Sequence, residues 1–369
     1  MRRWLAVVVL VVGCAPAGPP PSTPTPPPSG PPATKERPRY TVHVTDVGTG
    51  LGVFVEGEDF TLVYDAGSND DLAIGEKNRF VAYVRAVRPD LKKIDHVVLS
   101  HPHRDHVELL ADVVTTWSVS NVWDSGAVND ICGYRRFLQA VADSPGTVYH
   151  SAAHDPGAHV IDFGKELCKK FPPKLQLRHG ARVTEDAPIT LGASAKMTFL
   201  HVDGETHAND FNESSLVTLL ELDGAKVLVM GDAEAGGRDD PGKPPSPKSV
   251  EGRVLAKYRD RLRSDVLVVG HHGSKSSSRK AFVETVAPKV SVISSGPTQY
   301  AKVVLPDPEI RDELRAIGDV FETDVDDEAC AKNPNKVGPD ADDRPGGCDN
   351  VQIKIQGGAL KARYARFGD

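Results

Sequence analysis

The feature that most constrains this chain is a buried strand that ends in a cluster of metal-type donors. Residues 95–100, DHVVLS, form an apolar, β-branched run, and His101-Pro102-His103-Arg104-Asp105-His106 follows directly. Histidine and aspartate are donors that zinc, manganese and iron take in proteins. A solvated polar loop is the alternative, because the chain has 13 histidines. The HxHxDH spacing directly after an apolar strand favours a metal site over such a loop.

Two further apolar runs end in the same kinds of side chain. Residues 227–231, VLVMG, lead to Asp232, and residues 265–270, DVLVVG, lead to His271, His272 and then Ser274. A lone aspartate after a strand is usually a turn residue, but here three strand ends carry donors. We therefore predict one site that all three strand ends share.

The order of the predicted elements indicates two sheets with helices outside them. Short strands are predicted over 40–47, 51–56, 60–67, 95–100, 195–202, 215–232 and 264–270. Helices are predicted over 76–87, 107–115, 253–263, 279–286 and 307–317. The turn Leu222-Asp223-Gly224 is typical of a hairpin. Residues 125–190 and 331–347 are predicted to be surface insertions.

The N-terminus predicts export. Arg2 and Arg3 precede nine apolar residues, which are too few to span a bilayer, since spanning takes roughly 20. Val11-Val12-Gly13-Cys14 resembles the bacterial lipobox. We predict a signal peptide over 1–13, a lipidated Cys14 and a proline-rich linker over 14–39. The mature protein would be attached to the bacterial membrane by its lipid, with the outer membrane or cell surface favoured.

Four more cysteines are Cys132, Cys168, Cys330 and Cys348. In an exported chain this number suggests two disulfides, for which three pairings exist. We favour Cys132–Cys168 and Cys330–Cys348, because each closes a local, loop-rich stretch.

The net charge of −7 gives no general attraction to nucleic acid, so binding would need a local basic patch. The candidates are Arg253, Lys257, Arg259, Arg261, Arg263, Lys275, Arg279 and Lys280. These side chains form either a solvated helix face or a phosphate-binding rim. Aromatic residues make up only 6% of the chain, and none is interleaved there for base stacking.

Together these motifs resemble the metallo-β-lactamase superfamily and, more narrowly, the metallo-hydrolase domain of the competence protein ComEC. The resemblance covers about 40–358 and rests on DVGTGLGVFV, LVYDAG, SHPHRDH, NESSLVTLLELDGAKVLVMGD, DVLVVGHHGSKSSS and FETD. It implies an α+β fold, a four-layer αββα sandwich, as a single domain over 40–369. It also implies two divalent metal ions, zinc or manganese, at the edge between the sheets.

The resemblance assigns roles residue by residue. His101 and His103 would hold metal 1, Asp105 and His106 would hold metal 2, Asp232 would bridge both, and His271 would complete metal 2 while His272 touches substrate. Asn212 stands where most superfamily members place a third histidine of metal 1. Its harder oxygen donor would favour manganese or magnesium over zinc. The nearby His201 and His207 are alternatives, and Asp46 and Asp65 match family positions that could orient a ligand.

The chemistry that this site implies is hydrolysis by a hydroxide shared between two metals. Asp105 as a ligand, and His272 or Ser274 as hydrogen-bond donors to substrate, are the predicted catalytic residues. A phosphodiester, in a small molecule or a nucleic acid, is the expected substrate. The alternatives are a lactonase or β-lactamase-type hydrolase and a non-catalytic surface binding module. The sequence indicates no protein partner.

Overall fold

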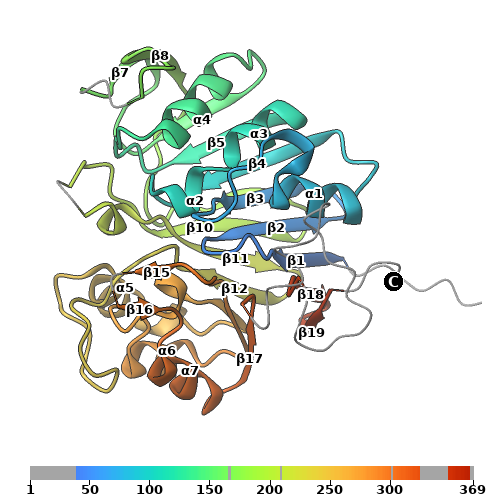
Figure 1. Cartoon of the computed structure of the whole chain (residues 1–369). Coiled ribbons are helices and arrows are strands. Elements are labelled where there is room, and N and C mark those ends of the chain that lie inside the picture. The colour runs from blue at the N-terminus through green and yellow to red at the C-terminus, as the bar shows by residue number, and fades with distance from the viewer. Residues whose placement is uncertain (1–38, 165–167, 208–209, 301, 325–347, 366–369) are drawn as a thin grey trace, which may run out of the picture. The chain divides into compact units, whose positions relative to one another are not determined.

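Two mixed β-sheets pack face to face, and helices cover their outer sides (Figure 1). The computed structural model describes residues 39–164, 168–207, 210–300, 302–324 and 348–365. Pro38–Asp369 form one compact unit. The predicted signal peptide, Cys14 and nearly all of the predicted linker lie outside the described residues. Within the described residues, no helix is both long and apolar enough to cross a membrane.

The first sheet has ten strands in the order β19-β18-β1-β2-β3-β4-β5-β6-β8-β7. Their bounds are β1 Tyr40–Val44, β2 Gly52–Gly57, β3 Thr61–Ala66, β4 Lys93–Leu99, β5 Ser118–Asp124, β6 Val148–Ser151, β7 Gly157–Asp162, β8 Lys174–His179, β18 Val351–Gln356 and β19 Ala359–Tyr364. Strands β3 to β6 run parallel to one another, so their carboxyl ends lie at one edge.

The second sheet has seven strands in the order β17-β14-β13-β12-β11-β10-β9. Their bounds are β9 Ile189–Gly192, β10 Ala195–His201, β11 Val217–Leu222, β12 Ala225–Val229, β13 Val266–Val268, β14 Val290–Ile293 and β17 Asp319–Glu322. Strands β12, β13, β14 and β17 are parallel. A separate hairpin joins β15 Gln299–Tyr300 to β16 Val303–Val304.

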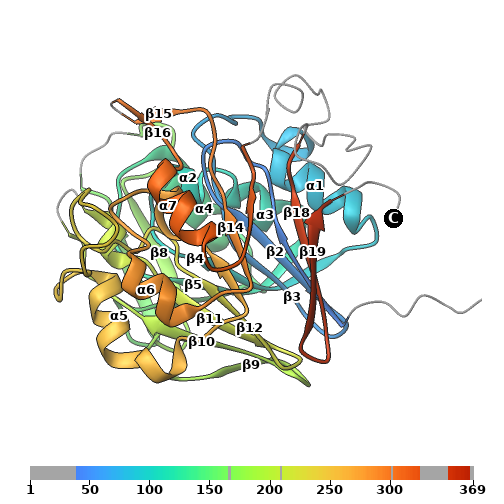
Figure 2. The same ribbon diagram turned by 90° about the horizontal axis from the view of Figure 1, so that it is seen from below.

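The helices form the two outer layers (Figures 1 and 2). Their bounds are α1 Arg79–Val87, α2 Arg104–Val107, α3 Leu110–Thr116, α4 Cys132–Ala142, α5 Val250–Tyr258, α6 Lys280–Val286 and α7 Pro308–Arg315. Helices α1, α3 and α4 share a buried cluster with the outer face of the first sheet, and α5, α6 and α7 share one with the second. The predicted αββα sandwich is therefore confirmed.

The alternation of strand residues produces these layers. In β2, Val53 and Val55 enter the cluster between the two sheets, whereas Phe54 between them enters the cluster under the helices. Both faces of the central strands are buried, so their sequences read as continuous apolar runs. Burial of these runs stabilises the fold at about 25 cal/mol per Å² of apolar surface.

Two local predictions had opposite outcomes. The hairpin at Leu222-Asp223-Gly224 is confirmed: Asp223 and Gly224 have φ of 48° and 89° and join β11 to β12. The prediction of a surface insertion over 125–190 is wrong. This stretch supplies α4 and strands β6, β7 and β8, which extend the first sheet.

The first predicted disulfide is confirmed, since Cys132 at the start of α4 is bonded to Cys168 before β8. Cys348 is also disulfide-bonded. Cys330 lies outside the described residues, so its pairing with Cys348 stays a prediction.

Candidate metal centre

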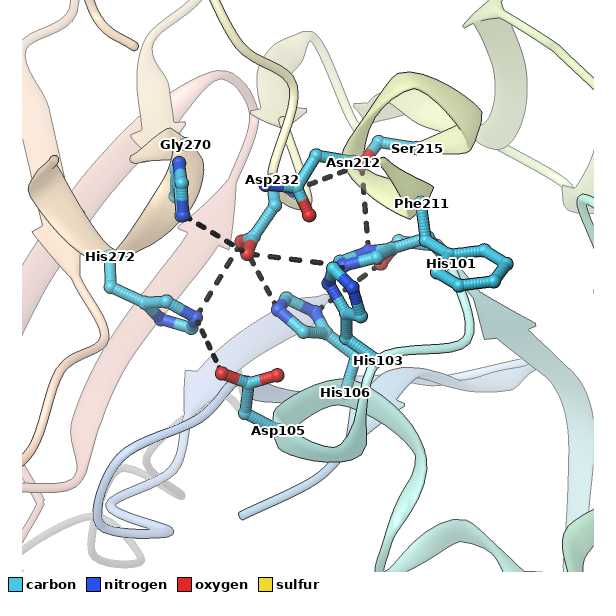
Figure 3. A network of polar contacts seen from close by, with 12 residues as sticks. His101, His103, Asp105, His106, Phe211, Asn212, Ser215, Asp232, Gly270 and His272 are labelled. Carbon is cyan, nitrogen blue, oxygen red and sulfur yellow. Dashed lines mark hydrogen bonds and ion pairs between the residues drawn. The ribbon is translucent and has the colours of Figure 1, made fainter. Parts of the chain in front are cut away.

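Parallel strands bring the predicted donors together. Strands β3 and β4 are paired in parallel, and β12 and β13 are paired in parallel in the other sheet. The residues after these strands therefore meet at one edge of the sandwich (Figure 3). The loop after β3 passes so close to α2 that a Cβ added to Gly67 would lie 2.1 Å from the backbone nitrogen of His106. Only glycine fits there.

The first donor group consists of His101, His103 and Asp232. His101 Nε2 lies 3.0 Å from His103 Nδ1 and 3.9 Å from Asp232 Oδ2. His101 and Asp232 are buried, and His103 is half-buried. The two imidazoles and the carboxylate thus face one point at the strand ends.

The second donor group consists of Asp105, His106 and His272, all buried. His272 Nε2 lies 3.7 Å from Asp105 Oδ2 and 3.6 Å from Asp232 Oδ1. His106 Nε2 lies 3.1 Å from the same Oδ1. Asp232 therefore directs one oxygen at each group, which is the arrangement of a bridging ligand.

Unpartnered polar atoms show that a divalent cation fits the second donor group. His106 Nε2, His272 Nε2 and Asp232 Oδ1 are buried, and none has a hydrogen-bond partner in the described part of the chain. His106 Nε2 and Asp232 Oδ1 are close but not aligned for a hydrogen bond. Burying polar atoms in this state is costly. One metal ion at the second donor group would satisfy all three atoms.

Other side chains fix the orientation of these imidazoles. His106 Nδ1 lies 2.8 Å from Asp65 Oδ2, and His272 Nδ1 lies 2.8 Å from the carbonyl oxygen of Ser294. Each contact leaves Nε2 directed at the donor groups, as in metal-binding histidines whose other nitrogen donates to an oxygen. Asp65 has the orienting position that the sequence suggested. Asp46 instead lies beside Arg79 and the backbone of Gly48.

The structure reverses the expected order of the two adjacent histidines. His272, not His271, belongs to the group around Asp105 and His106. His271 Nε2 lies 3.8 Å from Asp232 Oδ2, the oxygen that faces the first group. Its Nδ1 lies 2.7 Å from Ser276 Oγ and 3.0 Å from Glu234 Oε1. The geometry thus places His271 on the side of metal 1.

Asn212 lies beside Asp232 in the close view of the site (Figure 3). Its Nδ2 donates to Glu234 Oε1 at 3.1 Å, and its buried Oδ1 has no hydrogen-bond partner in the described ranges. The alternatives point elsewhere: His201 contacts the Ser215 carbonyl and Arg253, and His207 contacts Asp203.

Ser274, which the sequence predicts as a donor to substrate, is buried, and this role stays a prediction. Its hydroxyl accepts a hydrogen bond from Arg238 at 2.9 Å and contacts Ser276 Oγ at 3.1 Å. These contacts hold it within the loop that follows His272. Ser274 therefore supports this loop.

The imidazoles of the site differ in the direction in which their surroundings shift the pKa. Burial, together with neighbouring imidazoles, lowers the pKa of His101 and His103, so both are in the neutral form that binds metal. For His106 burial also lowers the pKa, but Asp232 and Asp65 outweigh it and hold the pKa above its usual value. Burial raises the pKa of Asp232, yet His106, His272 and His271 hold it well below its usual value. Metal binding would release the His106 proton.

Sequence reasoning missed three contacting residues. Glu234 contacts Asn212 and His271, and its position two residues after Asp232 was the only signal. Tyr300 Oη donates to Asp105 Oδ2 at 2.6 Å, and Asn69 Nδ2 donates to the same oxygen at 3.0 Å. Tyr300 lies on the β15–β16 hairpin, almost 200 residues from Asp105 in sequence, and no motif marks it.

The basic cluster on α5 is largely paired with carboxylates. Arg253 contacts Glu213 at 2.9 Å, Lys257 contacts Glu185 at 2.5 Å and Arg261 contacts Asp186 at 2.8 Å. Lys275 and Lys280 also have carboxylate partners, and Arg279 is buried against backbone carbonyls. These contacts favour a solvated, ion-paired face over a phosphate-binding rim.

Comparison with known proteins decides the family. A sequence profile of the metallo-beta-lactamase superfamily matches residues 45–296, which contain every residue of the two metal-donor groups. The chain belongs to this superfamily. Superfamily membership supports hydrolase activity, and its members usually bind divalent metals, in keeping with the two donor groups.

Curated relatives of this superfamily member have names connected with competence and recombination. It is 34% identical over 110 residues to competence protein ComA of Neisseria gonorrhoeae, covering 30% of this chain and 14% of that protein. It is 24% identical over 260 residues to recombination protein 2 of Haemophilus influenzae, covering 70% of this chain and 25% of that one. The chain thus spans at most a quarter of the length of these two relatives.

Two solved structures are similar to this chain at low sequence identity. The metallo-beta-lactamase fold protein YhfI of Bacillus subtilis matches with a TM-score of 0.41 and 13% identity, over 76% of this chain and 96% of that one. Igni18, described as a metallo hydrolase from Ignicoccus hospitalis, matches with a TM-score of 0.40 and 13% identity, over 77% and 95%.

Proposed function

We propose that this chain is a two-metal phosphodiesterase. The observation that carries the proposal is the position of Asp232, whose Oδ1 faces His106 and His272 while its Oδ2 faces His101 and His271. One carboxylate between two groups of imidazoles suits two cations a few ångströms apart. Such a pair clamps the attacking and leaving oxygens of a phosphodiester.

The proposed ligand sets follow from the donor groups. His101, His103, His271 and Asp232 Oδ2 would hold metal 1, with Asn212 Oδ1 beside them. Asp105, His106, His272 and Asp232 Oδ1 would hold metal 2. When bound, two such ions would supply a water of lowered pKa and positive charge for the substrate oxygens.

The residues around the ligands would keep this arrangement in place. The Asp65 carboxylate and the Ser294 carbonyl hold the Nδ1 protons of His106 and His272, so that Nε2 presents its lone pair. Tyr300 and Asn69 donate to Asp105 and limit its rotation. Burial of the ligands excludes bulk water and strengthens every charge interaction at the site.

A phosphodiester is favoured over a lactone or β-lactam by the relatives. Their names concern competence and recombination, processes of DNA. We propose that the substrate is a nucleic-acid or small-molecule phosphodiester.

We also propose that Cys14 anchors the protein to the membrane by lipid. Cys14→Ser should leave the membrane fraction and lose the mass of the lipid, and unchanged fractionation and mass would contradict the anchor.

The proposed function is tested by metal content and hydrolysis together. Wild type, Asp232→Ala, His271→Ala and His272→Ala are loaded with Zn²⁺ or Mn²⁺. Each is then assayed on bis(p-nitrophenyl) phosphate, DNA, RNA, a phosphocholine ester and a lactone. We expect phosphodiester hydrolysis by wild type and loss of both hydrolysis and stoichiometric metal in Asp232→Ala. Hydrolysis of the lactone alone would overturn the substrate class. Two metals bound by Asp232→Ala would overturn the bridging role.

A further inference from the structure

A second group of imidazoles lies at the far end of the first sheet, away from Asp232. His154 lies in the loop after β6, His159 lies on the edge strand β7, and His179 ends β8 beside it. Ring centroids are 4.6 Å apart for His154 and His159, 4.9 Å for His154 and His179, and 5.0 Å for His159 and His179. Three segments of the chain thus bring three imidazoles into mutual contact.

His179 is the member of this group that needs a partner. It is 3% exposed, and neither ring nitrogen has a hydrogen-bond partner within the part of the chain that the structure describes. Its ring packs at 90° against Tyr149, with centroids 4.9 Å apart. A buried polar group without a partner destabilises the folded state. A ligand bound to one of these nitrogens would remove part of this cost.

We propose that His154, His159 and His179 form a transition-metal site, separate from the catalytic centre, that takes Zn²⁺ or Cu²⁺. Imidazole nitrogens suit both ions. Around one tetrahedral ion with metal–nitrogen bonds of about 2.0–2.1 Å, the centroids of ligating imidazoles lie about 5 Å apart. The three observed separations are close to this value. The site would hold the loop after β6 against the edge of the sheet, where strands lack a neighbour.

The rings would have to turn to close on an ion. His154 and His159 now stack at 13°, and the nitrogens of the three rings do not converge as they do in the catalytic groups. His159 is exposed and His154 half-buried, so both can rotate about their side-chain bonds. His159 Nε2 contacts the Asp155 carbonyl at 2.9 Å, and Nδ1 would be its metal-binding atom.

Local charge is compatible with a cation. Burial lowers the pKa of His154 and lowers that of His179 to about 4, so both are neutral at pH 7 and retain a lone pair. Arg182 lies near His154 and opposes a cation. However, its Nη1 is 3.6 Å from Asp155 Oδ1, which offsets its charge.

Zinc stoichiometry of the full chain at pH 7.5 tests the proposal. The test variant is His154→Gln/His159→Gln, which spares the buried His179 and therefore the fold. The matched control is His207→Gln, another incompletely buried histidine, which contacts Asp203. Asp232→Ala is measured in parallel, because it should lose catalytic metal and keep the second site. Cu²⁺ added to Asp232→Ala is examined by electron paramagnetic resonance for nitrogen couplings.

We expect the double variant to lose one zinc equivalent, and its phosphodiester hydrolysis to equal that of wild type. His207→Gln should lose none, and Asp232→Ala should keep one equivalent with couplings from several nitrogens. Equal zinc content in wild type and the double variant would overturn the proposal. Loss of an equivalent in His207→Gln, with none lost in the double variant, would place the ion near Asp203 and would overturn the proposal as well. Failure of the proposed hydrolysis would leave the zinc content and the nitrogen couplings unaffected, so the two proposals can fail separately.

Discussion

Replacing Asp65 by asparagine should weaken metal binding although Asp65 touches no metal in the proposed site. Asp65 is fully buried and accepts hydrogen bonds from the backbone nitrogen and the hydroxyl of Ser100, each at 2.7 Å, and from His106 Nδ1 at 2.8 Å. Burial raises the pKa of Asp65, whereas His106 and Ser100 favour its ionised form. The carboxylate holds the His106 proton on Nδ1, so that Nε2 can bind metal.

The expected loss of metal affinity follows from the hydrogen-bond donors and acceptors that Asp65→Asn changes. An asparagine offers one oxygen acceptor and one NH₂ donor, so with Ser100 bonded to the oxygen, the NH₂ group faces His106 Nδ1. The imidazole then prefers its proton on Nε2, which removes the lone pair from the metal. Returning the proton to Nδ1 places two donors face to face, which costs about 1–3 kcal/mol for a buried donor. Metal affinity should therefore fall about 10- to 100-fold, the range for a lost orienting partner.

The assay is a competitive titration of Zn²⁺ and Mn²⁺ against a chromogenic chelator. Asp124→Asn is the matched control, because Asp124 is also a buried aspartate at the end of a strand, β5, and accepts from Tyr134 and Tyr149. The control should bind metal as wild type does. If Asp65→Asn also retained wild-type affinity, the orienting role of Asp65 would be refuted. Equal losses in both variants would point to general destabilisation instead.

Three further outcomes are expected. Asn212→His should shift the metal preference from Mn²⁺ towards Zn²⁺, because its unpartnered Oδ1 would be replaced by an imidazole nitrogen; an unchanged preference in metal-reconstitution assays would place Asn212 outside the metal shell. Cys132→Ser/Cys168→Ser should lower the free energy of unfolding by about 4 kcal/mol in the chain-entropy model, since the bond closes a separation of 36 residues; urea denaturation measures this, and a loss below about 1 kcal/mol would contradict it. Burial lowers the pKa of His96 to about 4, so at this residue the unfolded chain binds more protons than the native one near pH 5 to 6; His96 alone should therefore lower stability by about 2 kcal/mol from pH 7.5 to 5, and His96→Gln should remove that share of the pH dependence in urea denaturation.

The sheets and the donor motifs could be predicted because both produce local patterns in the sequence. Continuous apolar runs mark strands that are buried on two faces, and a polar residue after such a run marks the end of the strand. Asp232 and the HxHxDH segment were found in this way. Residues 125–190 were misassigned because β7 and β8 belong to the sheet edge. In β8 the burial alternates between buried and exposed residues, and β7 is mostly exposed, so neither shows the long apolar run of a central strand.

The site residues that sequence reasoning missed are connected through tertiary contacts. Tyr300 reaches Asp105 from a short hairpin, and its two strands of two residues each carry no hydrophobic period that could be recognised. Glu234 lies near the motif, but a carboxylate two residues after a strand end is usually solvated. Its contacts with Asn212 and His271 depend on how β11 and β13 place those residues.

His271 and His272 show why the roles of two adjacent histidines can be assigned only from the structure. Both residues have left-handed backbone conformations, with φ of 47° and 53°, although neither is glycine. Such strain persists only where surrounding contacts enforce it, and it is common at functional sites. The Ser276 and Glu234 contacts hold one ring, and the Ser294 carbonyl holds the other. With both backbones in this conformation, His271 Nε2 faces Asp232 Oδ2 and His272 Nε2 faces Asp232 Oδ1. Spacing alone could not choose between them, because in this geometry each serves a different metal.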